Sequence, residues 1–428
     1  MDGNDNTVNI IDSTKLKKVI LLTQFCEPEP QHVGIVFAKK LASHGHKMEV
    51  VTGFPNYPGG KIYTGFKRTW RKATDSDGIK LVRLWLFLSH SKSKIGRVLN
   101  YGSFALTSFI YLLFNTRRND VIYVYHPPIT VGLVAIVIKL VTGCKVIIDI
   151  QDLWPESLAV TGFVRNDSVL KITNTLCNLV YDKSDHIIVL SDGFKKNLLN
   201  KGVEKSKVSV IFNWADDEKS YLAEVMTREV DRVDPKNFNI LYAGNLGEAQ
   251  GLKAVIDAAS ICKKNGLQDV RFIFLGDGVS KIDLEEYSEL CQLDNVAFIP
   301  RVDSIEAREY MEAADVMLVH LIEDPLFKIT IPSKIQAYLA AGRPILVAVD
   351  GEATEIVIAA QAGVAAKSGD PESIANAALR FTQFSASDLR DMGNAGRDFY
   401  VEKMALDKGI HATDEIIRGL YGVYTGTK

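Results

Sequence analysis

Hydrophobic positions along the chain fall into short continuous runs, separated by longer segments with helical spacing. In the first half the runs lie at 17–25, 47–53, 120–126, 145–152, 186–191 and 208–213. A second series lies at 239–245, 270–278, 295–301, 315–321 and 344–349. Because these runs are apolar throughout, they are typical of parallel strands that helices cover on both faces. Their alternation with helical segments predicts a doubly wound α/β fold.

The break between the two series predicts two domains. Residues 218–238 are charged and lack a buried-strand pattern, and a chain of 428 residues exceeds one ordinary core. We predict an N-terminal Rossmann-like domain over residues 1–213 and a C-terminal one over residues 214–399. The amphipathic segment 400–428 is expected to be helical and to complete the N-terminal domain. Two facing Rossmann-like domains bind ligands beyond the carboxyl ends of their strands.

Cysteine usage and the first residues indicate the compartment. The five cysteines are scattered and show no Cys-x-x-Cys spacing, which favours a reducing cytosol over disulfides or zinc. The polar, acidic start of the chain lacks the basic and apolar regions of a signal peptide. No uncharged apolar run reaches the ~18 residues of a membrane-spanning helix. A cytoplasmic protein is therefore expected. The cysteines are Cys26, Cys144, Cys177, Cys262 and Cys291.

Basic residues concentrate between positions 61 and 118, where twelve Lys and Arg face two Asp. Such a segment either meets an anion or forms a solvated surface. Within it, the apolar stretch 97–114 is flanked by Lys92, Lys94 and Arg97 on one side and by Arg117 and Arg118 on the other. A helix of this kind either lies in the headgroup plane of a membrane or belongs to the core of the first domain.

Candidate ligand-binding loops follow three predicted strands of the second series, and two of these loops contain glycine. They read Gly-Asn-Leu-Gly at 244–247, Gly-Asp-Gly at 276–278 and Pro-Arg-Val at 300–302. Glycine lets the backbone approach either a ligand or a neighbouring element closely. Together with Gly34, at the start of the first predicted helix, these loops supply candidate donor-binding residues. The candidates are Gly34, Gly244, Asn245, Gly276, Arg301 and Val302.

The stretch 327–349 contains a helix pattern that opens with Pro332, Ser333 and Lys334 and ends at Gly342. We expect Pro332 at the first helical position. The first turn of a helix has free N–H groups that favour an anion, and a cation there costs roughly 0.3–1 kcal/mol. Ser333 and Lys334 therefore suggest a bound anion such as a diphosphate. The alternative is a capped helix whose lysine reaches to solvent.

Several longer motifs resemble a known family. They are "GHKMEVVTGFPNYPGGKIYTGFKR" (45–68), "DIQDLWPESLAVTGF" (149–163), "VLSDGFKKNLLNKGVEKSKVSVIFNWAD" (189–216), "ILYAGNLGEAQGL" (240–252), "FLGDG" (274–278) and "TIPSKIQAYLAAGRPILVAVDGEA" (330–353). On these motifs the chain resembles bacterial glycosyltransferase family 4, which has the GT-B architecture of two facing Rossmann-like domains. The resemblance is to the branch of O-antigen and capsule enzymes that includes L-N-acetylfucosamine transferases.

The resemblance implies a retaining, metal-independent transfer of a sugar from a nucleotide diphosphate, with no cofactor. We expect a UDP-sugar donor, carrying an N-acetylated or deoxy-amino sugar, and a polyprenyl-diphosphate-linked saccharide acceptor. Such an enzyme would be peripheral on the inner face of the cytoplasmic membrane and would have no nucleic-acid partner. Its product would enter O-antigen, lipopolysaccharide or capsule assembly.

Two departures from the family pattern affect the donor site. The family's two glutamates, eight residues apart, correspond to Ile329 and Ala337, and its phosphate-binding Arg and Lys correspond to Asn245 and Gln250. Lys334 is then the best-placed cation for the diphosphate. Glu352, in the loop after the next strand, is a candidate replacement for the missing ribose ligand.

Candidate catalytic residues follow strands of the first series. Asp152 ends "KVIIDIQD", where the resemblance implies a polar residue facing the reacting sugar, and His126 ends "DVIYVYH". Glu156 in "WPES" is a third candidate. A strand-end Asp or His also serves often as a hydrogen-bonding fixture. Asp75-Ser76-Asp77 imitates a metal-binding motif, but it is expected in a loop, and no metal is expected.

Two other functions share the two-domain plan. A nucleotide-sugar 2-epimerase would need no lipid acceptor, so the basic, apolar segment before Arg118 favours a transferase. A non-catalytic nucleotide-binding subunit is suggested by Ile329 and Ala337, which lack the family's carboxylates.

Overall fold

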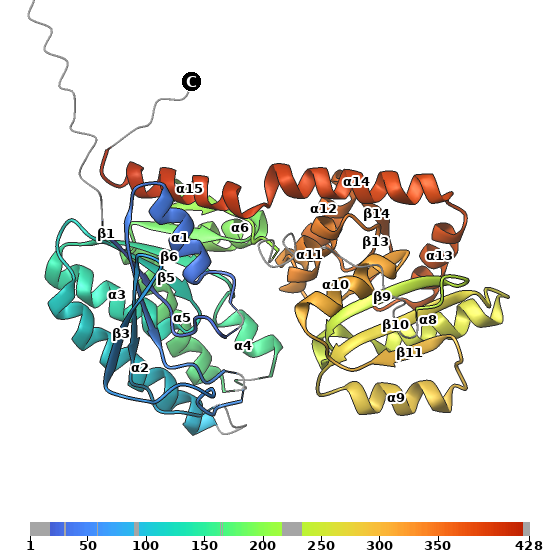
Figure 1. Ribbon diagram of the computed structural model, residues 1–428, viewed down its shortest axis with the longest axis horizontal. Coiled ribbons are helices and arrows are strands. Elements are labelled where there is room, and N and C mark those ends of the chain that lie inside the picture. Colours follow the sequence, from blue (N-terminus) through green and yellow to red (C-terminus); the bar gives the residue numbers. More distant parts are fainter. Residues whose placement is uncertain are drawn as a thin grey trace, which may run out of the picture. The chain divides into compact units, whose positions relative to one another are not determined.

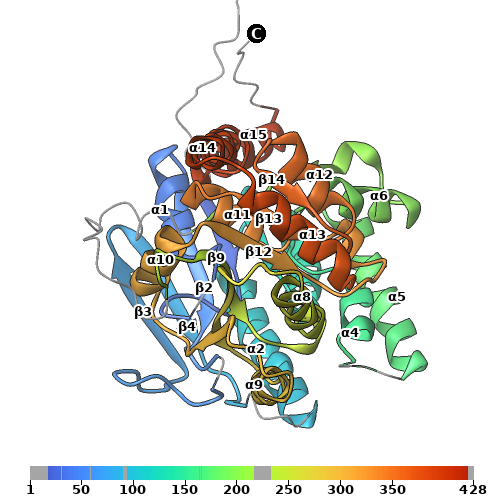
Figure 2. The same ribbon diagram turned by 90° about the vertical axis from the view of Figure 1, so that its right-hand side faces the viewer.

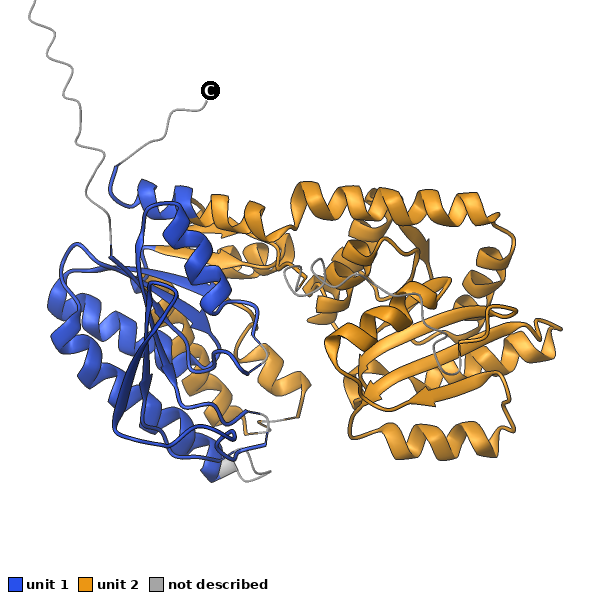
Figure 3. Ribbon diagram, viewed as in Figure 1, with its two compact units in different colours: residues 1–149, 183–185, 414–428 blue, residues 150–182, 186–413 orange. Residues whose placement is uncertain are grey.

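The structure is a computed structural model that describes residues 18–29, 31–57, 59–89, 94–162, 164, 166–215 and 233–422. It divides into two compact units, coloured separately in Figure 3. The first unit comprises residues 1–149, 183–185 and 414–428, and the second comprises residues 150–182 and 186–413. The domain boundary near residue 213 stays a prediction.

An eight-stranded sheet contains the strands predicted from the first series. Its order is β3-β4-β2-β1-β5-β6-β7-β8. Figure 1 labels β1, β3, β5 and β6 of this sheet. The connections from β1 lead to one side of the sheet and those from β4 onward lead to the other, so the order reverses between β1 and β5. The strands are β1 Lys18–Leu22, β2 Lys47–Gly53, β3 Arg71–Ser76, β4 Ile79–Leu84, β5 Val121–His126, β6 Lys145–Ile150, β7 His186–Val189 and β8 Val208–Val210.

The edge strand β3 was not predicted, because it is polar and exposed along almost its whole length. It pairs antiparallel with β4, and Asp77 occupies the turn between them with a φ of 54°. Asp75 and Ser76 therefore end a strand, so the expectation of a loop at Asp75-Ser76-Asp77 was wrong. Asp77 forms an ion pair with Lys39, 2.6 Å away.

Helices cover both faces of this sheet. Since β-α-β crossovers are right-handed, the helix between β1 and β2 and the helices that follow β4 and β5 lie on opposite faces. The helices α2 and α3 pack against each other on one of these faces (Figure 1). The helices connecting the strands are α1 Ile35–Ser43, α2 Lys94–Asn115, α3 Ile129–Thr142, α4 Glu156–Val160, α5 Asp167–Lys183 and α6 Asp192–Asn200.

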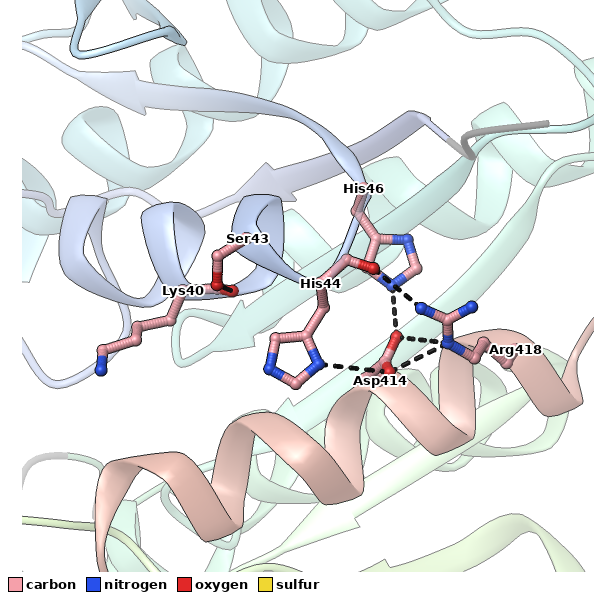
Figure 4. Close-up of polar contacts among 6 residues, drawn as sticks. All are labelled: Lys40, Ser43, His44, His46, Asp414 and Arg418. Carbon is pink, nitrogen blue, oxygen red and sulfur yellow. Dashed lines mark hydrogen bonds and ion pairs between the residues drawn. The ribbon is translucent and has the colours of Figure 1, made fainter. Parts of the chain in front are cut away.

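The C-terminal helix α15 (Leu406–Gly419) returns to the first unit, as predicted for the fold. The carboxylate of Asp414 accepts two hydrogen bonds of 2.9 Å from Arg418 Nε and lies 2.6 Å from His46 Nε2 and 3.3 Å from His44 Nδ1 (Figure 4). Burial lowers the pKa of His46. Burial alone would raise the pKa of Asp414, but the bonds from Arg418 and His46 hold it below its usual range. A charged Arg418–Asp414 pair thus fixes α15 against the end of α1.

A six-stranded parallel sheet contains the strands predicted from the second series. Its order is β11-β10-β9-β12-β13-β14, which reverses between β9 and β12. Figure 2 labels β9, β12, β13 and β14 of this sheet. Two apolar cores fill its two faces. The strands are β9 Phe238–Asn245, β10 Val270–Asp277, β11 Val296–Ile299, β12 Val316–His320, β13 Ile345–Ala348 and β14 Gly363–Ala365. The helices are α8 Lys253–Lys264, α9 Lys281–Leu290, α10 Ser304–Ala313, α11 Ser333–Ala341, α12 Glu352–Ala359, α13 Pro371–Thr382 and α14 Ala386–Lys403.

Candidate active site

The reversal of strand order in the second sheet places the strongest donor-site candidates together. In open parallel sheets, ligands bind beyond the carboxyl ends of the strands at the point where the order reverses. Here that point lies between β9, which ends in Gly244 and Asn245, and β12, which leads into α11. Sequence-predicted residues from both elements therefore converge on one edge of the sheet.

The helix α11 begins one residue later than predicted. Pro332 has a φ of −60° and a ψ of 139°, so it is the extended N-cap and the helix starts at Ser333. Ser333 is exposed and Lys334 follows it in the first turn, as expected. The helix ends at Gly342, whose φ of 66° gives the left-handed cap that glycine adopts readily.

Lys334 turns back toward the end of β9. Its Nζ lies 4.7 Å from the centroid of the Tyr242 ring, and a Cβ atom placed on Gly244 would lie 3.0 Å from Nζ. Burial lowers the pKa of Lys334 to about 8. Among the described residues, no carboxylate forms an ion pair with this ammonium group. Within the described part of the chain, the Tyr242 ring face is the group that attracts this partly buried cation, and such a cation is suited to receive an anion.

Two glycines and two tyrosines shape the backbone around Lys334. Gly276 pairs with Gly244 across β10 and β9, and a Cβ on Gly276 would lie 1.9 Å from the Gly244 carbonyl oxygen. Tyr338 on α11 accepts a 2.9 Å hydrogen bond from the Ala243 N–H, and Tyr242 donates a 2.7 Å bond to the Asn245 carbonyl. The close approach that glycine allows at 276 thus brings β9 and β10 together at the site, and the tyrosines anchor the strand end.

Gln250 and His320 hold the loop after β9 through hydrogen bonds, a role that the sequence analysis did not assign to them. The side-chain oxygen of Gln250 accepts 3.1 Å hydrogen bonds from Asn245 Nδ2 and from the Gly247 N–H. His320, buried at the end of β12, lies 2.6 Å from the Gln250 carbonyl through Nδ1 and accepts from the Gly369 N–H through Nε2. Burial lowers the pKa of His320. Its position as a polar strand-end residue was the signal available in the sequence.

Two further donor-site candidates lie farther along the same edge. Arg301 and Val302 follow β11, which is separated from β9 by β10. The Arg301 side chain is exposed, and among the described residues no hydrogen bond or ion pair joins it to Lys334. The structure therefore places Arg301 and Val302 at the expected edge without joining them to the Gly244–Lys334 pair.

Glu352 begins α12, and its carboxylate is engaged by backbone groups of the second unit. It accepts hydrogen bonds from the N–H groups of Gly193 and Asp192, the latter at 3.0 Å, at the start of α6. Burial raises the pKa of Glu352. The observed contact is that of an acidic group at a helix N-terminus. Its role toward ribose stays a prediction.

The first sheet has its own reversal point, between β1 and β5, and Gly34 lies in the loop that follows β1. Gly34 precedes α1, and both carboxylate oxygens of Glu27 lie 2.9 Å from the Ile35 N–H at the start of that helix. A Cβ on Gly34 would lie 2.2 Å from Glu27 Oε2. The anion position at this helix N-terminus is therefore filled by the chain's own carboxylate. Sequence reasoning missed Glu27, although an acidic residue shortly before a helix was visible.

His126 ends β5 at the same reversal point and is completely buried. Burial lowers the pKa of its imidazole to about 4. The ring is therefore neutral at physiological pH.

The other two catalytic candidates follow β6 in the second unit. Asp152 is exposed and makes no hydrogen bond or ion pair with a described residue, and partial loss of hydration raises the pKa of its carboxyl. Glu156, at the start of α4, forms a 2.6 Å ion pair with Lys201. Of these two, Asp152 retains an accessible carboxylate. Across the described ranges, no group of three or more His, Cys, Asp or Glu side chains is placed to hold a metal ion.

Comparisons with known proteins identify the class. Residues 237–383 match the family model "Glycosyl transferases group 1", and residues 37–214 match "Glycosyl transferase 4-like domain". The chain is 26% identical over 313 residues to the putative colanic acid biosynthesis glycosyl transferase WcaI of Escherichia coli K12, covering 71% of this chain and 75% of WcaI.

Solved structures show the same fold. Sucrose-phosphate synthase from Thermosynechococcus elongatus superposes with a TM-score of 0.72 at 16% identity, over 95% of this chain and all of that one. Anabaena HepE in complex with UDP superposes with a TM-score of 0.67 at 13% identity, over 94% of this chain and all of that one. The fold is therefore GT-B, as predicted. With both glycosyl transferase models matching, this protein is a glycosyltransferase.

Proposed function

We propose that the protein is a retaining, metal-independent glycosyltransferase of surface polysaccharide assembly. It moves an N-acetylated or deoxy-amino sugar from a UDP-sugar to a polyprenyl-diphosphate-linked saccharide. The similarity to WcaI, named for colanic acid biosynthesis, supports the pathway class. The complex of the similar HepE structure with UDP supports the choice of nucleotide.

The observation that carries the donor proposal is the state of Lys334. Its ammonium group is partly buried, its pKa is lowered by burial, and no described carboxylate compensates it. A diphosphate in the first turn of α11 would supply that compensation and would also accept from the free N–H groups of the turn. Gly244 leaves space beside Nζ that a side chain would fill.

The transfer itself requires a new bond between the acceptor oxygen and the anomeric carbon as the bond from that carbon to the diphosphate breaks. UDP leaves with the electron pair, and the acceptor hydroxyl loses its proton. Asp152, with its exposed carboxylate, is the proposed group that stabilises charge at the reacting sugar. His126 is neutral and could only accept or donate a hydrogen bond there, and Glu156 is the third candidate.

One assay tests the proposal against its alternatives. The protein is incubated with UDP-sugars and a polyprenyl-diphosphate-linked saccharide, and nucleotide and lipid products are separated. We expect free UDP together with an elongated lipid whose new linkage keeps the donor's anomeric configuration. An epimerised donor without lipid elongation would overturn the proposal in favour of a 2-epimerase. Bound UDP without any product would indicate a nucleotide-binding subunit, and activity abolished by a chelator would contradict metal independence.

The same acceptor determines where the protein works. A polyprenyl diphosphate keeps its chain in the bilayer, so a cytoplasmic enzyme must reach it at the inner face of the membrane. We therefore propose a cytoplasmic protein that associates peripherally with that face. Fractionation of cells should recover it with membranes at low salt and release it at high salt.

A further inference from the structure

The helix α2 exposes a stripe of apolar residues. Its exposed positions recur at the spacing of one helical stripe and are all apolar, whereas several buried positions are polar. A helix that covers a sheet normally turns polar residues to the solvent, whereas α2 exposes an apolar stripe in addition to burying Phe104 and Leu112. The exposed positions are Ile95, Val98, Leu99, Gly102, Leu106, Ile110 and Phe114.

Polar side chains on the buried face of α2 form hydrogen bonds within the first unit. Asn100 donates a 2.6 Å hydrogen bond to the Phe87 carbonyl, Thr107 donates a 2.8 Å bond to the Trp85 carbonyl, and Tyr111 donates to Glu49. By length and composition alone, residues 95–115 could cross a membrane, and a third of that stretch is buried. Because the inner face is fixed to the sheet by these bonds, the helix can offer only its outer stripe to a partner.

The apolar surface continues onto α3. The two helices pack side by side, and a Cβ on Gly143, just after α3, would lie 3.4 Å from Cγ of Arg118, just after α2. The exposed apolar residues at the end of α3 are Val137, Leu140 and Val141. The outer stripes of α2 and α3 therefore form one apolar surface on one face of the sheet.

Basic side chains border this surface. The β3–β4 hairpin lies along α2, since Arg71 lies 5.8 Å from the Tyr111 ring and Lys80 Nζ lies 3.0 Å from the Tyr111 hydroxyl. Next to Arg71, the exposed residues Lys67, Arg68 and Lys72 extend the basic border. Arg117 and Arg118 are exposed where α2 ends.

We infer that the outer faces of α2 and α3 are a docking surface for an anionic lipid bilayer, with the stripe inserted among the headgroups and the basic border against the anionic lipids. An apolar stripe beside cations matches the interface of such a bilayer, and not its interior. Self-association through the same surface would bring two basic borders together, which like charge disfavours. The inference rests on the proposed function in one respect, since it is the lipid-linked acceptor that makes a membrane the relevant partner.

Two of the flanking residues named from the sequence cannot be used to define the surface. Lys92 lies outside the described residues, and nothing is described of the Lys94 side chain. The test therefore changes residues in the exposed stripe of α2 and in the basic border next to Arg71.

The test measures binding of the full chain to vesicles, without any sugar donor. Vesicles of phosphatidylcholine with phosphatidylglycerol are compared with phosphatidylcholine alone by co-sedimentation at low salt. Wild type should bind only the anionic vesicles. Leu106→Glu with Phe114→Glu should weaken binding about a hundredfold or more, and Lys67→Glu with Lys72→Glu should weaken it about tenfold or more. Raised salt should weaken wild-type binding.

Matched controls lie on the second unit. Leu290→Glu changes a residue that is 80% exposed, compared with 81% for Phe114, and Lys236→Glu with Lys264→Glu reverses two exposed lysines. Both controls should bind vesicles like wild type, and all variants should keep the wild-type melting temperature because the changed residues are exposed.

Three results would overturn the inference: no binding by wild type, equal binding by the α2 variants, or a wild-type dimer that the stripe variant makes monomeric. Vesicle binding without sugar transfer would support the docking surface and contradict the proposed function. Sugar transfer to lipid without vesicle binding would support the proposed function and contradict the docking surface.

Discussion

The two reversal points of the two sheets, each described within its own unit, differ in the charge that faces their glycines. Beside Gly34 lies the carboxylate of Glu27, which already accepts the N–H of Ile35 at the start of α1. Beside Gly244 lies the ammonium group of Lys334, which has no described counter-ion. The two sheets thus share a topology, but their helix starts differ. At the start of α1 the Glu27 carboxylate already occupies the anion position, whereas no described carboxylate pairs with Lys334 at the start of α11.

This difference separates candidate roles. A diphosphate binds best to a cation without a counter-ion. Among the described residues, Lys334 beside the second sheet is such a cation, whereas the place beside Gly34 in the first is taken by the Glu27 carboxylate. After the strands of the first sheet, Asp152 presents an exposed carboxylate, whereas the neutral imidazole of His126 is completely buried at the end of β5. We therefore expect substitutions beside the first sheet, such as Asp152→Asn, to change turnover. Substitutions of Lys334 beside the second sheet should instead change donor affinity.

The largest effect is expected from Asp152→Asn. The substitution is nearly isosteric and Asp152 is exposed, so the fold should persist while the charge is lost. We expect kcat to fall by about 10²–10⁴, the range typical of general-base or charge-stabilising groups, with unchanged affinity for UDP. Steady-state kinetics and calorimetry check the two halves of this prediction. Turnover above about a tenth of the wild-type value would assign Asp152 a structural role.

A tenfold effect per pH unit is expected from the titration of Lys334. Burial lowers the pKa of this lysine to about 8 in the free protein, and a bound diphosphate favours its protonated form. UDP affinity should therefore be full below about pH 8 and fall by up to about tenfold per unit as the pH rises above it. A phosphate is already ionised there, since its second pKa is about 6. Lys334→Met should remove this pH step, and an identical step in Lys334→Met would contradict the assignment.

A several-fold effect is expected from Glu27→Gln. If Gly34 belongs to the donor site, as predicted, then removing the neighbouring negative charge should raise UDP affinity about threefold or more. The same change weakens a charge–dipole interaction at the start of α1 and should lower the free energy of unfolding by about 0.3–1 kcal/mol. Reduced stability with wild-type affinity would make Glu27 a helix cap and remove Gly34 from the site. Glu29→Gln is unsuitable as a control, because Glu29 is buried and bonds three backbone N–H groups.

The smallest effect is expected from Glu352→Gln. The glutamine keeps one acceptor oxygen for the N–H groups of Asp192 and Gly193, so thermal unfolding should show a loss of about 0.3–1 kcal/mol. The predicted ribose role requires, in addition, a higher KM for the donor. A wild-type KM would remove that role and leave Glu352 as a cap of α6.

The sequence predicted most of the buried strands, but it missed β4, in which Lys80 and Arg83 interrupt the apolar residues. Each of the eleven apolar runs coincides with a strand, because parallel strands covered on both faces need apolar side chains throughout. β3 escaped notice because an exposed edge strand carries no such pattern, and β14 spans only three residues. The start of α11 was misplaced by one residue, since Pro332 is compatible with both an N-cap and a first helical position.

The candidate site was predictable only in part. Glycines at strand ends and Lys334 in a first helical turn are local signals, and the structure brings Gly244, Gly276 and Lys334 together. Their partners depend on contacts between distant segments. Neither the hydrogen bond from the Ala243 N–H to the Tyr338 hydroxyl nor the placement of Glu27 against Gly34 follows from spacing. Glu352 was assigned to ribose from its loop position, whereas its observed partners start α6.

The central claim is that Lys334 holds the donor diphosphate, and isothermal titration of UDP into wild type and Lys334→Ala at pH 7 tests it most directly. Because Lys334→Ala removes a charged hydrogen-bond partner, it should weaken UDP binding about 10–150-fold. The control is Lys328→Ala, which changes an exposed lysine that is already paired with Glu323 and should bind UDP like wild type. Thermal unfolding of free Lys334→Ala should show an intact fold. Wild-type UDP affinity in a folded Lys334→Ala protein would contradict the claim.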